Sequence, residues 1–323
     1  MARPLSARLR RLARPLAGLL ALACAGQLRA QTQVEHADPA PIVVRPVPRR
    51  FAELDVPLHP AVAPAPDGRF FAALQTRPDP VLWIVPADGG EPFAFRKMWA
   101  AYKPRWAPSG NRIGFIAAIG PPRIWTVEVD PATGRPIDPP RLLYRTAANA
   151  FAFSPDGERV AFVPRSTTAA GASEIHIVEW ESRRVRRLLR EDGMIYRLDW
   201  SPDGAFIYYG LAPNAPADST HRVVRARVAN GSAQTVLHVQ EFLGLAPDGS
   251  TLLYRPAHAE QSQRDVLELA LTGGERLVRI AVPAGATPTW GPSAASLVQV
   301  RASEAGDEIW EIPTPALWCL FAW

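Results

Sequence analysis

Short apolar segments follow one another along this chain, and a turn motif built around Pro-Asp-Gly separates them. The motif is complete at Phe153–Gly157, at Trp200–Gly204 and, with Leu in place of the aromatic residue, at Leu245–Gly249. Looser copies are centred on Pro66, Pro108 and Pro292, so that successive prolines of the motif are 42 to 47 residues apart. A regular period of this length indicates a repeat architecture.

The residues of the motif explain why it forms a turn. Proline presets its backbone φ, aspartate accepts hydrogen bonds from nearby backbone N–H groups, and glycine adopts the positive φ that other residues resist. An apolar strand precedes each turn and another follows it, and a third and usually a fourth strand complete the unit. Four strands in each unit of about 45 residues predict an all-β fold, a six-bladed β-propeller of four-stranded blades.

The sixth repeat is too short to hold a fourth strand, because few residues follow Ile312. The segment Arg50 to Val56 lies before the first repeat and has no unit of its own. We therefore expect this segment to pair with Glu308 to Ile312 as the outer strand of the last blade. Such an N-terminal outer strand would close a propeller over residues 50–312 and protect its exposed edges.

The N-terminal residues have the pattern of an export signal. Arginines precede an apolar run from Pro15 to Ala25 that is too short to span a bilayer, so residues 1–30 are interpreted as a signal peptide. Ala21 to Cys24 resembles a lipobox, which leaves open a lipid anchor at Cys24 and a lipoprotein. Residues 31–49 are predicted to be a Pro-rich linker and residues 313–323 an aromatic tail of unassigned role.

Removal of the signal changes the charge of the chain. The whole sequence has 36 basic and 31 acidic residues, six of the arginines lie in residues 1–30, and the remainder is 30 minus 31, or −1. The basic balance of the whole chain therefore gives no reason to expect nucleic-acid binding. We expect no transmembrane helix, and a periplasmic or otherwise exported location in a bacterium.

The repeat resembles that of the TolB-like β-propeller family. The resemblance lies in Trp-Ser-Pro-Asp-Gly, the apolar strand after it and the Asn/Asp-Gly turn that ends the third strand, and it covers residues 50–312. It implies an exported, non-enzymatic binding or scaffold module of the cell envelope that recognises a protein or another envelope partner. The α/β domain that precedes the TolB propeller has no counterpart in this sequence, which puts a direct role in the Tol system in doubt.

Enzymatic alternatives remain open. Similar repeats form the propeller of prolyl-oligopeptidase-like peptidases, but the nearest match to their nucleophile motif, around Ser293, occupies a turn of the sixth repeat. A propeller hydrolase or lyase is the other alternative, although no catalytic constellation is visible in the sequence. Neither the six histidines nor the recurring turn aspartates have the spacing of metal ligands. We therefore predict no enzymatic activity, no metal and no cofactor.

The best candidates for recognition lie on the face opposite the Pro-Asp-Gly turns. Loops on that face differ in length and chemistry between repeats, which suits a recognition surface. The connections between blades also bring aromatic and charged residues there, and aromatic residues and arginine are enriched among binding hot spots. The alternative is that the rings pack between blades. The candidate binding residues are Trp99, Tyr102, Lys103, Tyr196, Arg197, Glu241 and Phe242.

Overall fold

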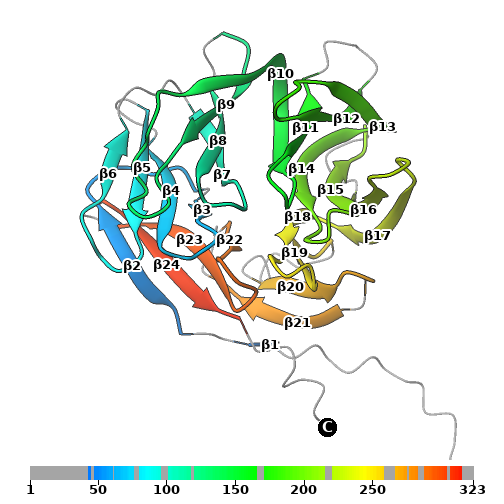
Figure 1. Ribbon diagram of the computed structural model, residues 1–323. Helices are drawn as coiled ribbons and strands as arrows, with labels where there is room; N and C mark the ends of the chain where they lie inside the picture. Colours follow the sequence, from blue (N-terminus) through cyan, green and yellow to red (C-terminus); the bar gives the residue numbers. More distant parts are fainter. Residues whose placement is uncertain are drawn as a thin grey trace, which may run out of the picture. The chain divides into compact units, whose positions relative to one another are not determined.

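The computed structural model describes twelve segments of the chain, all of them in the compact unit Ile42–Trp323. They are residues 43–44, 47–60, 62–75, 80–95, 101–117, 120–165, 171–214, 220–257, 266–274, 276–282, 287–303 and 306–314. The predicted signal peptide with Cys24, Trp99 and residues 315–323 of the predicted tail lie outside them. The described elements are all β-strands, arranged as a β-propeller (Figure 1).

The strands form five hydrogen-bonded sheets. One consists of β3 (Ala63–Pro64), β4 (Phe70–Gln75), β5 (Val81–Pro86) and β6 (Phe93–Phe95). The largest consists of β7 (Ala101–Trp106), β8 (Arg112–Ala117), β9 (Arg123–Glu128), β10 (Arg141–Phe153), β11 (Arg159–Pro164), β12 (Ala172–Glu179) and β13 (Val185–Asp192). The third consists of β14 (Met194–Trp200), β15 (Phe206–Ala212), β16 (His221–Arg227) and β17 (Ala233–Val239).

The last two sheets both include a strand from the N-terminal part of the described chain. One consists of β18 (Glu241–Leu245), β19 (Thr251–Arg255), β20 (Val266–Leu271), β21 (Arg276–Ala281) and β1 (Val43–Val44), which pairs in parallel with β21. The other consists of β22 (Thr289–Trp290), β23 (Ser296–Ala302), β24 (Asp307–Pro313) and β2 (Arg49–Leu54). The predicted linker thus contributes β1 to a sheet.

The prediction of six four-stranded blades is wrong. The described strands form five sheets, and only three of these have four strands. The main cause is β10, a single strand of 13 residues whose first part pairs with β9 and whose second part, from Ala148 onward, pairs with β11. The boundary between the second and third repeats of the sequence pattern therefore does not separate sheets here, and β10 unites seven strands (Figure 1).

The predicted pairing of the N-terminal segment with the last repeat is present. β2 runs antiparallel to β24, with Arg49 opposite Glu311 and Leu54 opposite Asp307. Leu54 is buried in the same cluster as Ile309, and the ring of Phe51 lies 5.0 Å from that of Phe71 in β4. The first and last strands of the repeat region are thus joined by both hydrogen bonds and apolar packing.

The Pro-Asp-Gly segments form the turns that the sequence predicts. In each of the four Asp-Gly copies the aspartate accepts a hydrogen bond from the backbone N–H two residues later, as Asp203 does from Ala205 at 2.9 Å. The glycine that follows has a φ between +70° and +74° in these copies, which is why glycine occupies this position. The aspartates are therefore used by the backbone of the turn.

Replacement of Asp203 by alanine is expected to lower the free energy of unfolding by about 1 kcal/mol, because its carboxylate accepts hydrogen bonds from the Ser201 hydroxyl and the Ala205 N–H. The Ser201 bond lowers the pKa of Asp203. This contribution is therefore present above the ordinary aspartate pKa and is lost as the pH falls through the lowered pKa. Urea unfolding at pH 7 and pH 3 measures both effects, and a loss equal to that of Asp192→Ala, an exposed position in β13, would contradict them.

Tryptophans of the repeat connect neighbouring sheets. Trp106 of β7 donates its indole N–H to the Ala63 carbonyl of β3 at 3.0 Å, and Trp290 of β22 donates to the Gly244 carbonyl of β18 at 3.1 Å. Both tryptophans are buried. Apolar side chains fill the space between sheets around them, and one cluster joins Phe70 of β4 to Phe115 of β8. This packing fixes the positions of the strands that begin each repeat.

Candidate functional site

Four strands that begin a repeat have a register irregularity a few residues before the turn motif. The register shifts between Tyr102 and Arg105 in β7, between Ala148 and Ala150 in β10, between Ile195 and Arg197 in β14, and between Phe242 and Gly244 in β18. A bulged residue is not paired in the ladder, so its backbone groups are free to bond elsewhere. The bulges thus supply backbone carbonyls that side chains of other strands can use.

Lys103 uses two of these carbonyls. It lies in the bulge of β7 with a φ of +54°, and its Nζ donates to the Asn149 carbonyl of β10 at 2.7 Å and to the Tyr196 carbonyl of β14 at 3.3 Å. Asn149 and Tyr196 are the bulged residues of their strands. Burial, followed by the charges of Arg105 and Arg197, lowers the pKa of Lys103 to about 8.

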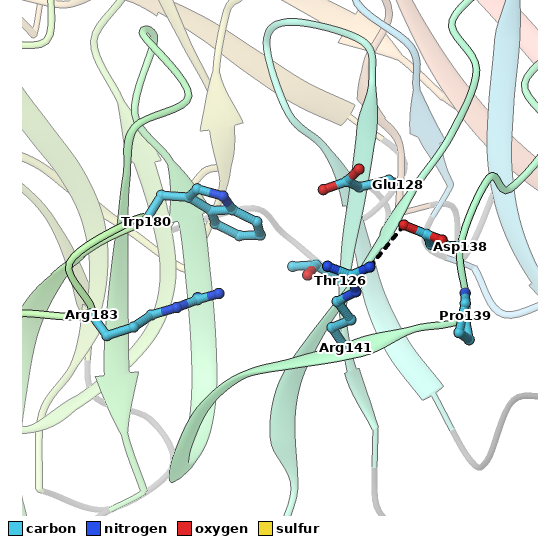
Figure 2. Close-up of a pocket in the computed structure, with 7 residues that line it drawn as sticks. All are labelled: Thr126, Glu128, Asp138, Pro139, Arg141, Trp180 and Arg183. Atoms are coloured by element: carbon cyan, nitrogen blue, oxygen red, sulfur yellow. Dashed lines mark hydrogen bonds and ion pairs between the residues drawn. The ribbon is translucent and has the colours of Figure 1, made fainter.

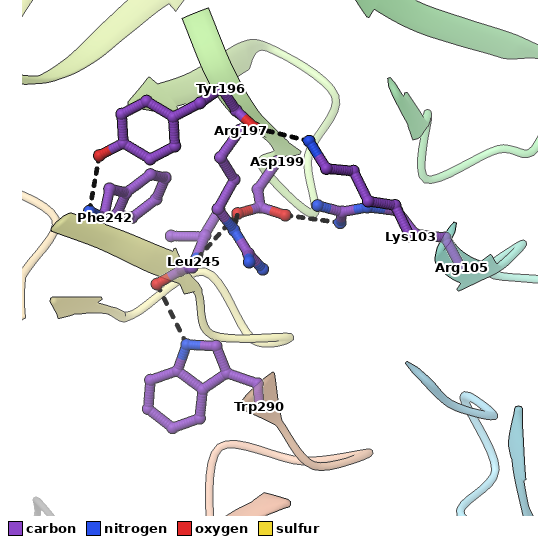
Figure 3. Close-up of polar contacts among 9 residues, drawn as sticks. Lys103, Arg105, Tyr196, Arg197, Asp199, Phe242, Leu245 and Trp290 are labelled. Atoms are coloured by element: carbon purple, nitrogen blue, oxygen red, sulfur yellow. Dashed lines mark hydrogen bonds and ion pairs between the residues drawn. The ribbon is translucent and has the colours of Figure 1, made fainter. Parts of the chain in front are cut away.

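One carboxylate holds two arginines beside this lysine (Figure 3). Asp199 of β14 accepts from Arg105 Nη1 at 2.7 Å through Oδ1 and from Arg197 Nε at 2.8 Å through Oδ2. The Leu245 N–H also donates to Asp199, at 3.3 Å. Burial alone would raise the pKa of Asp199, but the two guanidinium groups outweigh it and hold that pKa below its usual value. We refer to Lys103, Arg105, Arg197 and Asp199 as the inner cluster.

The inner cluster has more positive than negative charge. Its carboxylate is bonded through both oxygens, whereas each guanidinium has five N–H donors. For the donors of Arg105 and Arg197 that do not reach Asp199, the part of the chain that the structure describes offers no further hydrogen-bond acceptor. These two side chains are 27% and 24% exposed, so the unused donors are accessible to solvent. The arrangement provides fixed N–H donors beside water.

The position of Arg197 depends on a close approach to β18. A Cβ placed on Gly244 would lie 2.7 Å from Arg197 Nη2, and Gly244 has a φ of +150°. The Gly244 carbonyl is the acceptor of the Trp290 indole. The guanidinium of Arg197 therefore lies against a backbone segment that is itself held by a buried tryptophan.

The structure places the predicted recognition residues in different surroundings. Lys103 and Arg197 belong to the inner cluster, and the Tyr196 hydroxyl accepts from the Phe242 N–H at 2.8 Å. Phe242 is 1% exposed and lies in the core, so its ring is not available as a surface anchor. Tyr102 is half-buried against a core cluster, Glu241 pairs with Arg255 at 3.6 Å, and Trp99 lies outside the described residues. The role of these residues in binding stays a prediction.

Sequence reasoning missed Arg105 and Asp199. Both stand directly before the tryptophan of the repeat, whereas the equivalent positions of the other copies hold the uncharged residues Ala63, Ala152, Gly244 and Thr289. A comparison of the repeats position by position would have singled out these two charges. Their pairing would still have stayed hidden, because the residues are separated by 94 positions and by two repeats.

A second feature is a surface pocket beside β9 and β10 (Figure 2). Its lining includes two acidic residues, Glu128 and Asp138, and two basic residues, Arg141 and Arg183. Asp138 accepts from Arg141 at 2.9 Å, and Arg112 and Arg183 both lie against the Trp180 ring, at 3.5 and 4.9 Å from its centre. The pocket is thus lined by equal numbers of acidic and basic side chains, and its arginines pair with Asp138 or with the Trp180 ring. The inner cluster, in contrast, has an excess of positive charge.

Two features are absent from the part of the chain that the structure describes. No group of three or more His, Cys, Asp or Glu side chains lies close enough together to hold a metal ion in this part of the chain. Within the same ranges there is no helix of the length and hydrophobicity that crossing a membrane would require.

Comparisons with known proteins give structural likeness only. Neither the protein-family models nor the curated proteins give a match. Among solved structures, TolB from Acinetobacter baumannii is 18% identical with a TM-score of 0.54, over 70% of this chain and 57% of that one. A putative TolB from Agrobacterium tumefaciens is 17% identical with a TM-score of 0.55, over 80% and 90%.

An oligogalacturonate lyase from Vibrio parahaemolyticus is similar to the same degree, with 9% identity and a TM-score of 0.54 over 88% of this chain and 97% of that one. The chain spans little more than half of the length of the first TolB structure, and it is similar in fold both to TolB structures and to an oligogalacturonate lyase. At these identities the likeness shows the fold, and this chain has the fold of a β-propeller with TolB-like structural neighbours.

Proposed function

We propose that this protein is an exported, non-enzymatic binding module of the cell envelope, and that its partner contacts the inner cluster. One observation carries the proposal: Arg105 and Arg197 are fixed by a single carboxylate and retain unused, accessible N–H donors. Donors held in place before binding lose little freedom when a partner arrives. Hydrogen-bond donors fixed in this way suit the recognition of a partner.

The pKa values of Asp199 and Tyr196 support binding over acid–base catalysis. A catalytic acid or base works best with a pKa near the operating pH. Asp199 has a lowered pKa and both oxygens occupied, so it is a poor proton acceptor. Burial raises the pKa of Tyr196 to about 12, so its hydroxyl keeps its proton at neutral pH.

Export is proposed from the sequence and from the structural neighbours together. The basic and then apolar pattern of residues 1–30 is that of a signal peptide. The TolB structures have the same fold as this chain, and the TolB-like repeat implies a place in the bacterial envelope. Localisation of a tagged full-length chain to the periplasmic fraction tests this part of the proposal.

A lyase is the second candidate, and one observation favours it. Lys103 has a pKa of about 8, which suits a general base near neutral pH, and it lies beside two arginines that could hold an acidic sugar. An oligogalacturonate lyase is among the structural neighbours. Against this candidate, the Lys103 Nζ is engaged by the Asn149 and Tyr196 carbonyls rather than presented to a substrate.

One experiment with two readouts separates the candidates. The protein from residue 31 onward is used to capture partners from an envelope extract, and it is assayed against ester, peptide, glycan and polyuronate substrates. We expect capture that Arg197→Gln abolishes and that Arg187→Gln, at an exposed ion pair of β13, leaves intact. Turnover of any substrate that Lys103→Met abolishes would overturn the proposal in favour of an enzyme.

A further inference from the structure

We infer that the inner cluster is an oxyanion site, at which a carboxylate or phosphate group of the ligand accepts hydrogen bonds from Arg105 and Arg197. The inference rests on the proposed function and adds to it the chemistry that the partner must present. It begins from the charge of the site, which has three cationic side chains, Lys103, Arg105 and Arg197, and one carboxylate, Asp199, that is bonded to the two arginines (Figure 3).

The groups around the cluster do not cancel this excess. His59, from the segment between β2 and β3, faces Lys103, and burial together with the charge of Lys103 lowers its pKa. His59 is therefore neutral above its ordinary pKa and adds no charge to the cluster. Glu241 acts on Tyr196 and His221, and its carboxylate lies 3.6 Å from Arg255. An anion from outside would supply the missing charge.

The hydrogen-bonding geometry favours an oxyanion over other anions. Arg105 reaches Asp199 through Nη1 and Arg197 reaches it through Nε, so each guanidinium keeps further N–H groups on the same rigid plane. Guanidinium groups bind carboxylates and phosphates through paired, parallel N–H donors. Lys103 is already shared by two carbonyls, so its role at the site is to contribute charge.

Asp199 competes with an incoming anion for the N–H donors of the two arginines. It satisfies one donor of each arginine and reduces the net charge that an incoming anion meets. Removal of its charge alone should therefore strengthen anion binding, the opposite of what loss of a structural residue would do. An increase in anion affinity, rather than a decrease, is the sharpest consequence of the inference.

The test measures the affinity of the purified protein from residue 31 onward for citrate and for inorganic phosphate by calorimetry at constant ionic strength. We expect Arg197→Gln and Arg105→Gln each to weaken binding about tenfold or more, since a charge-assisted hydrogen bond is lost. Asp199→Asn is expected to tighten binding by about threefold to tenfold. Arg187→Gln removes an exposed arginine of β13 and should leave the affinity unchanged.

The pH dependence of anion affinity, which depends on Lys103, provides a second test in which both arginines are kept. Its pKa of about 8 should rise when an anion binds nearby, so wild-type protein should take up protons on binding at pH 8.5. The affinity should fall as the pH rises from 7.5 to 9.5, and Lys103→Arg should remove that fall. Guanidinium groups do not lose their proton in this range, and His59, whose pKa is lowered, stays neutral.

The outcomes separate the inference from the proposed function. Tighter binding to Asp199→Asn and weaker binding to the arginine variants support an oxyanion site, and a preference for citrate or for phosphate tells carboxylate from phosphate ligands. No binding by wild type, or equal losses in Arg197→Gln and Arg187→Gln, would overturn the inference. Partner capture without anion binding would leave the proposed function standing, whereas turnover with anion binding would remove that function and keep the site.

Discussion

Replacement of Asp199 by alanine is expected to lower the free energy of unfolding by about 3 kcal/mol, because it leaves two partly buried guanidinium groups without their shared carboxylate. The side chain of Asp199 is only 10% exposed, so water can replace little of the lost interaction. Lys103 adds to the repulsion between the two arginines. The Leu245 N–H also loses an acceptor.

Chemical unfolding at pH 7 measures this loss, with Glu174→Ala as a control. Glu174 also bonds two side chains, Arg187 and His176, but near the surface, where an ion pair contributes about 0–1 kcal/mol. Since the pKa of Asp199 is lowered in the folded state, its contribution is present above the ordinary aspartate pKa and disappears as the pH falls through the lowered value. Equal losses in the two variants would contradict the account of the inner cluster.

Replacement of Phe242 by alanine should cost about 3–5 kcal/mol of stability, the usual loss when a buried phenylalanine is truncated. Its side chain is 1% exposed and lies in a cluster with Tyr254, Val223 and Leu252. The cluster draws on two sheets, so the cavity would open at a junction between them. Thermal unfolding measures the loss, and the same change at the exposed Met194 should have little effect.

The same variant decides between the two roles that the sequence leaves open for the aromatic residues. If Phe242 packs in the core, folded Phe242→Ala keeps the wild-type affinity for citrate or phosphate at a temperature below its own midpoint. Unchanged stability together with a lost affinity would instead make Phe242 a binding anchor, in conflict with its burial.

The sequence predicts the local elements of this fold well because each rests on neighbouring residues. The turn at Asp203 needs only Ser201, Gly204 and the backbone around them, and the strands follow from apolar residues near each turn. The continuity of β10 depends instead on whether residues 141–153 bend or stay extended between two repeats. Nothing local determines that choice, so the prediction of separate four-stranded blades failed there.

Only part of the candidate site could be predicted from the sequence, because its contacts join residues that are far apart in the chain. Lys103 and Arg197 attracted notice as charged residues in connections, but their partners are carbonyls of bulges and a carboxylate from other strands. Bulges are a property of paired strands, and the pairing of Arg105 with Asp199 requires the positions of two separate sheets. Contacts between residues of different repeats form only when the propeller is folded.

Hydrogen–deuterium exchange of the captured complex tests the central claim most directly, because it locates the bound partner on the strands. The account predicts protection of residues 101–106, 194–199 and 241–245, which contain the inner cluster and its supports, and unchanged exchange in the turns around Asp156, Asp203 and Asp248. The protection should be lost with Arg197→Gln and kept with Arg187→Gln. Protection of the Pro-Asp-Gly turns, with unchanged exchange along β7, β14 and β18, would contradict it.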